Sequence, residues 1–389
     1  MKYNKRDETV EPFYRFFIQE KRGRCKVNKE RMKRVLDEMK RQELPQLIVS
    51  DQASIAYLTG CSIDPGERLV ALIIRENNHH VAVVNRLFPL TEKDLGMPVI
   101  FVDDTDKGMG VLTLAKELDK DQPIAVEKNW AAHFLLDVMN ELNVPLSQYK
   151  LSSSVIDKVR AIKTEEEIEK MLEASHDNDL AMNQLIGLIP EKLTEVEMTK
   201  RLEEIYHKLD NDGFSFEPIV AYGGNGADPH HMNDDSTVQA GDSIIMDIGG
   251  IKNGYCSDMT RTVFYKEVSD KSREVYETVL EANKRAIDLI KPGVRLCDID
   301  AAARDYITSK GYGEYFTHRT GHFIGTEVHE AGDVSASNPD TVEEGMIFSI
   351  EPGIYISGEV GVRIEDLVVV TKDACKVLNE YPKELIIID

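Results

Sequence analysis

The sequence lacks the features that mark membrane proteins and disulfide-stapled secreted proteins. No apolar run approaches the roughly 18 residues that a membrane-spanning helix needs. The first 26 residues are charged throughout and contain no apolar core of a signal peptide. The five cysteines are scattered and form no CxxC pair, which does not fit a secreted disulfide framework. We therefore expect reduced thiols, a cytoplasmic location and no contact with a membrane.

Positive charge is also scarce, because the net charge is -22. A surface this acidic repels phosphate backbones, so we expect no nucleic-acid partner. At 389 residues the chain is too long for one ordinary domain, since domains hold roughly 100–200 residues. Hydrophobic residues make up 42% of the chain, which is enough to give each of two domains a core.

Helix and strand signals alternate in the first half. Residues 28–43 have the spacing of an amphipathic helix, and LIVS at 47–50 is typical of a short buried strand. VALII and HHVAVVN follow as two more strands, and helical patterns return near 111–119 and 129–142. This alternation predicts an α/β domain over residues 27–155. Residues 1–26 lie outside it as an N-terminal extension.

The second half contains an internal repeat. Residues 164–210 and 270–311 each have the pattern of two consecutive helices, and each pair is followed by a histidine-bearing loop. Each loop leads to a β-hairpin pattern, SIIMDIGGIKNGYCSDMTRTVFY in the first repeat and MIFSIEPGIYISGEVGVRIEDLVVV in the second. We therefore expect residues 156–389 to form one α+β domain with an internal pseudo-twofold repeat.

Acidic residues interrupt the apolar strands of both predicted hairpins. Asp247 follows SIIM, and Asp258 lies on the return strand. Glu351 follows MIFSI, and Glu365 lies in VRIED. A buried carboxylate is costly unless it is paired or bound to a metal. Four of them at equivalent positions in two repeats favour metal binding over separate structural roles.

Histidines supply the remaining donor. His318, His322 and His329 lie within twelve residues of one another beside the second hairpin. The last of them does not begin an HExxH zinc motif, because position 333 is aspartate. Four carboxylates and one imidazole form a hard, oxygen-rich donor set that suits two divalent cations. We expect Mn²⁺, with Co²⁺, Zn²⁺ and Fe²⁺ as alternatives.

These residues resemble the motifs of the pita-bread metallopeptidases, which include methionine aminopeptidase, aminopeptidase P and prolidase. The DxG and SDxTRT motifs, the GH motif, SIEPG and VRIED all match by residue type and spacing. The first half, including YLTG at 57–60, resembles the creatinase-type N-terminal domain and narrows the resemblance to the Xaa-Pro peptidases. The resemblance implies a creatinase-type α/β domain followed by a pita-bread catalytic domain.

The resemblance also implies roles for individual residues. The implied metal ligands are Asp247, Asp258, His322, Glu351 and Glu365. His230 and His329 are implied as catalytic and substrate-binding groups that donate hydrogen bonds to the oxyanion. Glu351 is implied to carry a proton to the leaving nitrogen. His318 and Arg363 are implied to bind substrate, whereas His231 is interpreted as a bystander. The implied substrate is a short proline-containing peptide, and relatives of this type are commonly homodimers.

Three activities remain open within the resemblance. We favour an Xaa-Pro dipeptidase because of the overall length and the compact second repeat. Aminopeptidase P, which acts on longer peptides, is the alternative, because EAGDV after His329 lacks a basic group to hold a dipeptide's carboxylate. Creatinase and a non-catalytic interaction module fit less well, since both lack metal ligands that this sequence retains.

Overall fold

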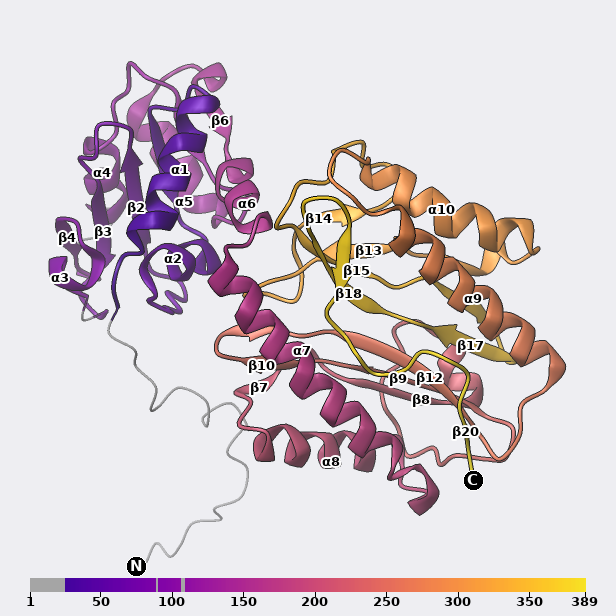
Figure 1. Ribbon diagram of the computed structural model, residues 1–389. Coiled ribbons are helices and arrows are strands. Elements are labelled where there is room, and N and C mark those ends of the chain that lie inside the picture. Colours follow the sequence, from indigo (N-terminus) through magenta and orange to yellow (C-terminus); the bar gives the residue numbers. More distant parts are fainter. Residues whose placement is uncertain (1–24, 89, 106–108) are drawn as a thin grey trace, which may run out of the picture. The chain divides into compact units, whose positions relative to one another are not determined.

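The structure is a computed structural model that describes residues 25–88, 90–105 and 109–389 (Figure 1). The chain divides at Ser153 into two compact units, which are described in turn. The predicted N-terminal extension, residues 1–26, lies outside the described residues except for its last two.

The first unit is built on a mixed sheet with the strand order β4-β3-β2-β1-β5-β6. Neighbours β1, β2 and β3 pair antiparallel, whereas the pairs β1–β5, β3–β4 and β5–β6 are parallel. The strands are β1 (Gln46–Val49), β2 (Val70–Arg75), β3 (Val81–Asn85), β4 (Val99–Val102), β5 (Ile124–Val126) and β6 (Tyr149–Leu151). Their alternation with helices confirms the predicted α/β class.

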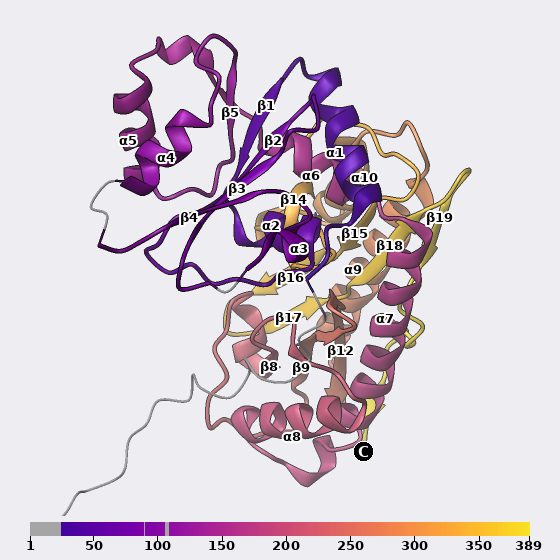
Figure 2. The same ribbon diagram turned by 90° about the vertical axis from the view of Figure 1, so that its left-hand side faces the viewer.

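Helices cover both faces of this sheet, with α4 and α5 on one side and α1 on the other (Figure 2). The helices are α1 (Lys29–Arg41), α2 (Gln52–Thr59), α3 (Glu92–Leu95), α4 (Met109–Lys116), α5 (Ala132–Leu142) and the 3-10 turn η1 (Leu146–Gln148). α1 begins where the Asn28 side chain accepts hydrogen bonds from two free backbone N–H groups. Met32, Val35 and Met39 then fall on one face and are buried.

A disulfide joins Cys25 to Cys61, so the expectation that all five cysteines stay reduced is wrong for this pair. The two Cα atoms lie 5.0 Å apart, within the range that a disulfide spans. The reason is tertiary, because Gly60 ends α2 in a left-handed conformation and the backbone of Lys26 hydrogen-bonds to Thr59. Cysteines 36 positions apart in the chain therefore become neighbours.

The second unit begins within α6 (Ser153–Ala161) and contains two helix pairs. They are α7 (Glu165–Ile186) with α8 (Glu195–Lys208), and α9 (Asp270–Leu289) with α10 (Leu296–Ser309). Reciprocal capping boxes start α7 at Thr164 and α8 at Thr194. The 3-10 turns of this unit are η2 (Ile189–Glu191), η3 (Gly223–Ala227) and η4 (Gly313–Tyr315).

Each helix pair packs on its own sheet (Figure 1). The first sheet has the order β20-β12-β9-β8, and the second has the order β14-β13-β15-β18-β19. Their strands are β8 (Ile219–Tyr222), β9 (Ser243–Ile248), β12 (Met259–Tyr265), β13 (Gly321–Phe323), β14 (Glu330–Val334), β15 (Ile347–Ile350), β18 (Asp366–Val370), β19 (Cys375–Val377) and β20 (Ile387–Ile388). The order of elements is the same in both halves, as the repeat predicts.

The predicted hairpins are each interrupted by a smaller ribbon. β10 (Gly250–Lys252) and β11 (Tyr255–Cys256) leave the first sheet and pair with each other, and β10 also pairs with β7 (Gly213–Phe214). β16 (Gly353–Ile356) and β17 (Val360–Arg363) form a separate two-stranded ribbon. In the described part of the chain, no helix combines the length and the apolar character needed to cross a bilayer.

A buried carboxylate closes the end of the first unit's sheet. Glu127 follows β5 and is 6% exposed, and its Oε2 accepts hydrogen bonds from the backbone N–H groups of Ser50 and Asp51 at 2.7 and 2.9 Å. Burial raises the pKa of Glu127 to about 7, although these two hydrogen bonds oppose the shift.

This pKa predicts a stability that falls with rising pH. The folded state holds the proton more tightly than the unfolded chain, so Glu127 stabilises the fold fully below about pH 4 and loses that contribution as the pH rises through about 7. The loss is about 3 kcal/mol of unfolding free energy. Urea unfolding between pH 5 and pH 8 measures it. Glu127→Gln should flatten the profile, whereas Glu141→Gln, at an exposed site, should not. Parallel profiles for the wild type and Glu127→Gln would contradict the assignment.

Candidate active site

The five predicted metal ligands come from both repeats of the second unit. Asp247 lies on β9, Asp258 directly precedes β12, and His322 lies on β13. Glu351 directly follows β15, and Glu365 directly precedes β18. The carboxylates of the second repeat therefore lie at one end of the antiparallel pair β15–β18. In the first repeat, Asp247 lies within the pair β9–β12 and Asp258 lies directly beside it.

The structure brings three of these side chains into one buried cluster. Asp258, His322 and Glu365 each place a ligand atom within 4.8 Å of the other two. Their exposed fractions are 4%, 4% and 1%. His322 Nε2 also lies 3.6 Å from Glu351 Oε1. The backbone N–H of His322 donates to Ser349 Oγ, which donates in turn to Glu351 Oε1.

Several carboxylate oxygens in this cluster are buried without a hydrogen-bond donor. Within the described residues, Asp247 Oδ1, Asp258 Oδ1 and Glu365 Oε1 have no hydrogen-bond partner. Burial, followed by repulsion from the neighbouring carboxylates, raises the pKa of Asp258 and of Glu365 well above the usual range. Unsatisfied, crowded carboxylate oxygens are the donor set that divalent cations neutralise. The residues present therefore fit a divalent metal centre.

Arg363 connects ligands of the two hairpins. Its Nη2 lies 2.6 Å from Asp247 Oδ2, and its Nε donates to Thr260 Oγ1 at 3.0 Å. Thr260 Oγ1 donates to Glu365 Oε2 at 2.8 Å. Arg363 is 3% exposed and every nitrogen of its guanidinium has a protein partner. Arg363 thus has a structural role besides its predicted role in substrate binding. It binds one carboxylate oxygen of Asp247 and leaves the other oxygen without a donor among the residues described.

His318 lies at the end of the same chain of contacts. Its Nε2 is 2.9 Å from the hydroxyl of Tyr355, which also accepts from Arg363 Nη1 at 2.9 Å. Its Nδ1 is 2.7 Å from the carbonyl of Arg319. Burial lowers the pKa of His318. Both ring nitrogens are therefore occupied by protein partners, and a hydrogen bond from either one to a substrate requires one of these contacts to break.

His329 directly precedes β14 and packs against the cluster. Its ring stands nearly perpendicular to that of His322, with the centroids 4.3 Å apart. Burial, and then the neighbouring His322, lower the pKa of His329 to about 4, so the imidazole is neutral near pH 7. The next residue, Glu330, anchors this loop through ion pairs with Arg160 at 2.7 Å and Lys163 at 3.0 Å.

His230 is exposed and lies in the loop that follows η3. Its imidazole has no hydrogen-bond partner among the residues that the structure describes. The adjacent His231, interpreted from the sequence as a bystander to catalysis, has a structural contact, because its Nε2 lies 2.6 Å from Oε2 of the fully buried Glu195. Glu195 also accepts from the backbone N–H groups of Tyr222 and Asp234. This carboxylate therefore fixes the loop that presents His230.

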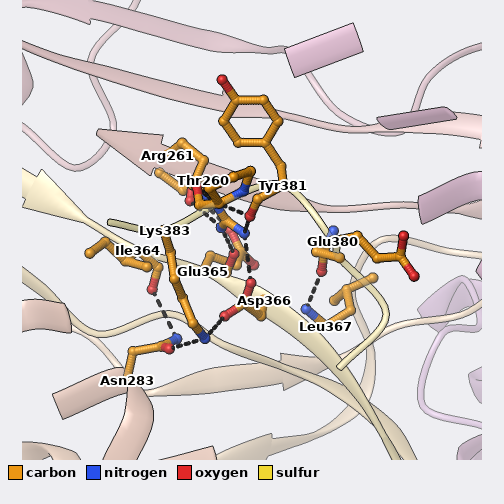
Figure 3. A network of polar contacts seen from close by, with 12 residues as sticks. Thr260, Arg261, Asn283, Ile364, Glu365, Asp366, Leu367, Glu380, Tyr381 and Lys383 are labelled. Carbon is orange, nitrogen blue, oxygen red and sulfur yellow. Dashed lines mark hydrogen bonds and ion pairs between the residues drawn. The ribbon is translucent and has the colours of Figure 1, made fainter. Parts of the chain in front are cut away.

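The reasoning from sequence missed the residues behind the cluster. Arg261, which is 2% exposed, donates to Asp366 Oδ1 at 2.8 Å and to the carbonyl of Glu365 (Figure 3). Asp366 also pairs with Lys383. A charged Arg261 inside the apolar strand MTRTVFY is the one sequence signal that could have indicated this buried pair.

The chain was compared with known proteins. Residues 169–372 match the model of metallopeptidase family M24, and residues 31–162 match the creatinase/prolidase N-terminal domain. An uncharacterized peptidase of Staphylococcus aureus is 33% identical over 364 residues, which cover 91% of this chain and 99% of the relative.

Solved structures agree with the family match. An Xaa-Pro dipeptidase from Bacillus anthracis is 31% identical with a TM-score of 0.81, and the match covers 92% of this chain and 99% of that one. An X-Pro aminopeptidase from Thermotoga maritima is 29% identical with a TM-score of 0.75, covering 90% and 100%. The range matched by the M24 model includes all five predicted ligands. The chain belongs to metallopeptidase family M24 and is a metal-dependent peptidase.

Proposed function

We propose that the protein is a two-metal hydrolase that cleaves Xaa-Pro dipeptides, with its catalytic machinery in residues 156–389. The observation that carries this proposal is the set of buried carboxylate oxygens of Asp247, Asp258 and Glu365 that lack a protein donor among the described residues. Similarity to an Xaa-Pro dipeptidase along 92% of the chain supports the choice of substrate.

The five ligands form an oxygen-rich set with a single imidazole, which favours Mn²⁺ over a structural zinc. When bound, two such cations polarise the scissile carbonyl and make water a nucleophile near neutral pH. Asp258, His322 and Glu365, whose ligand atoms lie within 4.8 Å of one another, would hold the cations together with Asp247 and Glu351. Glu351 lies beside His322.

Glu351 is placed to move a proton. Burial opposes its ionisation, but the charges of His322, His318 and Arg363 lower the pKa of Glu351 below its usual value. Its carboxylate is therefore ionised near pH 7 and can accept a proton from the attacking water. It can then deliver this proton to the leaving proline nitrogen. Ser349 Oγ, 3.1 Å from Oε1, orients the carboxylate for this task.

His329 and His230 can donate hydrogen bonds to the oxyanion that develops at the scissile carbonyl. A neutral His329 has one N–H to donate, and its ring is held against His322. His230 is carried on the loop that Glu195 fixes. We assign His318 and Arg363 to holding Tyr355 and Asp247 in place, in addition to their predicted contact with substrate.

Arg319 is a candidate for holding the free carboxylate of a dipeptide. It is half-buried, and within the described part of the chain it has no ion-pair partner. It is also close enough to His329 to help lower the pKa of that imidazole. Its guanidinium can supply the positive charge that is missing from the EAGDV segment after His329.

The second candidate function is that of an aminopeptidase P acting on longer Xaa-Pro peptides. Similarity to an X-Pro aminopeptidase over 90% of the chain favours it. So does the absence of a basic residue directly after His329 in the sequence.

We also propose a homodimer in the cytoplasm. The free cysteines Cys256, Cys297 and Cys375 fit a reducing compartment, whereas the Cys25–Cys61 bond fits an oxidising one. Free thiols can be counted in protein extracted from cells under acid quench. Five free thiols would support a reducing compartment such as the cytoplasm, and three would support an oxidising one.

Light scattering of the purified protein tests the proposed dimer.

Removing a central ligand should abolish both metal retention and hydrolysis. We expect Asp258→Ala and Glu365→Ala to lose bound Mn²⁺ on dialysis and to hydrolyse Xaa-Pro dipeptides at background rates, because each removes a carboxylate at the centre of the cluster. Elemental analysis and a rate assay measure this. Glu359→Ala, which removes an exposed carboxylate, is the control and should behave as the wild type. Full activity with metal retained in either ligand variant would refute the site.

Replacing the oxyanion donors should separate chemistry from metal binding. We expect His329→Ala and His230→Ala to retain metal while kcat falls by about 10²–10³-fold. His176→Ala, at an exposed position of α7, should leave kcat unchanged. An unchanged kcat in His329→Ala would remove this residue from the mechanism.

If Arg319 binds the free carboxylate of a dipeptide, it should make the enzyme prefer dipeptides over longer peptides. We expect kcat/KM to be higher for an Xaa-Pro dipeptide than for an Xaa-Pro-Yaa tripeptide with the same first residue. Arg319→Met should raise KM for the dipeptide by about tenfold, since it removes a charge-assisted contact, and should leave KM for the tripeptide unchanged. A preference for the tripeptide in the wild type would instead establish the aminopeptidase.

A further inference from the structure

The two longest helices of the second unit carry a buried asparagine at the same place. Asn178 on α7 and Asn283 on α9 are both fully buried. Each is the fourteenth residue of its helix, counted from Glu165 in α7 and from Asp270 in α9. A buried amide in the apolar face of a helix is costly unless all its hydrogen bonds are made, so a matched pair in two repeats needs a reason.

Both amides donate to backbone carbonyls beside predicted ligands. Asn178 Nδ2 lies 2.9 Å from the carbonyl of Ile248, the residue after Asp247. Asn283 Nδ2 lies 3.0 Å from the carbonyl of Ile350, the residue before Glu351. It also lies 3.4 Å from the carbonyl of Ile364, the residue before Glu365. One side chain on α9 therefore contacts the backbone directly before both predicted carboxylate ligands of the second repeat.

The orientation of the Asn283 amide is fixed by its other partner. Lys383 Nζ lies 2.8 Å from Asn283 Oδ1, and it also pairs with Asp366 (Figure 3). An ammonium group can only donate a hydrogen bond. The oxygen of the amide must therefore face Lys383, and the NH₂ group must face the carbonyls. Tyr206 takes the corresponding place in the first repeat, because its hydroxyl bonds to Asn178 Oδ1.

The two contacts of Asn283 restrain the peptides that directly precede Glu351 and Glu365, whereas the contact of Asn178 restrains the peptide one residue beyond Asp247. A hydrogen bond to a carbonyl restrains the rotation of its whole peptide plane, because the peptide group is planar. The direction of the Cα–Cβ bond of the adjoining residue is restrained with that plane. For Glu351 and Glu365, the restrained peptide is the one that links each residue to the residue before it. For Asp247 the held carbonyl belongs to the next residue, at the end of β9.

We propose that Asn178 and Asn283 are a symmetry-related pair of positioning residues that aim the carboxylates of the two repeats at the bound cations. The inference rests on the proposed two-metal site and adds residues that touch neither metal nor substrate. Partners of this kind behind metal ligands typically contribute about 10–100-fold to metal affinity. Asn283 should contribute more than Asn178, because it holds the backbone beside two ligands and Asn178 holds it beside one.

The test is Mn²⁺ binding to metal-free protein, measured by isothermal titration calorimetry alongside thermal unfolding of the same samples. We expect Asn283→Leu to weaken binding by about 10–100-fold and Asn178→Leu by a smaller factor. The matched controls are Thr278→Val on α9 and Ser175→Ala on α7. Both control residues are buried on the same helices and make no hydrogen bond to a ligand strand within the described residues.

The controls distinguish an effect on the orientation of the predicted ligands from a general loss of stability of the helix. If the asparagines only stabilise the fold, an asparagine variant and a control variant with the same loss in unfolding temperature will bind Mn²⁺ with the same affinity. That result would contradict the proposal. Should Asn283→Leu not fold, Lys383→Met tests the same point, since it frees Oδ1 and should weaken binding by several-fold. Wild-type affinity in Lys383→Met would overturn the proposal in that case. Wild-type affinity in Asp258→Ala would instead overturn the two-metal site itself.

Discussion

The burial of carboxylates without donors is the constraint on which the second unit depends. An ionised carboxylate taken out of water is strongly destabilising unless a partner is supplied. Asp258 and Glu365 are nearly fully buried, and each keeps an oxygen with no donor in the described residues. Burial, followed by repulsion from the neighbouring carboxylates, raises the pKa of both groups well above its usual range.

Two other buried acidic groups of the same unit, Asp366 and Glu330, have cationic partners and differ from the cluster in this respect. Asp366 is neutralised by Arg261 and Lys383, and Glu330 is neutralised by Arg160 and Lys163. Asp247 shares features of the paired and the unpaired carboxylates, because one of its oxygens accepts a hydrogen bond from Arg363 and the other has no donor among the described residues. In the two structural pairs of Asp366 and Glu330, the chain supplies the neutralising cations itself.

The repeat explains how one chain builds such a site. Neither half contains the complete set of predicted ligands, since His322 and two glutamates come from the second half and the aspartates come from the first. Each half places its helix pair on the outer face of its own sheet and its carboxylates on strands that meet at the other half. Thr260 and Arg363 make the connection, because they hydrogen-bond to each other and to ligands of both halves.

Much of the fold was predictable from the sequence, because helix caps, apolar spacing and Gly-rich turns act over short distances. The two-domain α/β and α+β architecture and the repeat followed from such patterns, whereas the family followed from the resemblance of the DxG, SDxTRT, GH, SIEPG and VRIED motifs to those of known metallopeptidases. Element ends were less predictable. The hairpins, for example, contain inner ribbons that leave the main sheets. The roles of the five ligands, His230 and His329 stay predictions.

What the sequence determined by itself was which residue types lie at which positions along each strand and helix. Only the tertiary structure decided which of them become neighbours. Cys25 and Cys61 pair, His231 finds Glu195, and Asn283 reaches two strands. The physical reason is that these contacts join segments tens of residues apart, and their geometry is set by how helices pack on sheets. Spacing along the chain carries no record of such distances, whereas it fully records the local periodicity that forms each element.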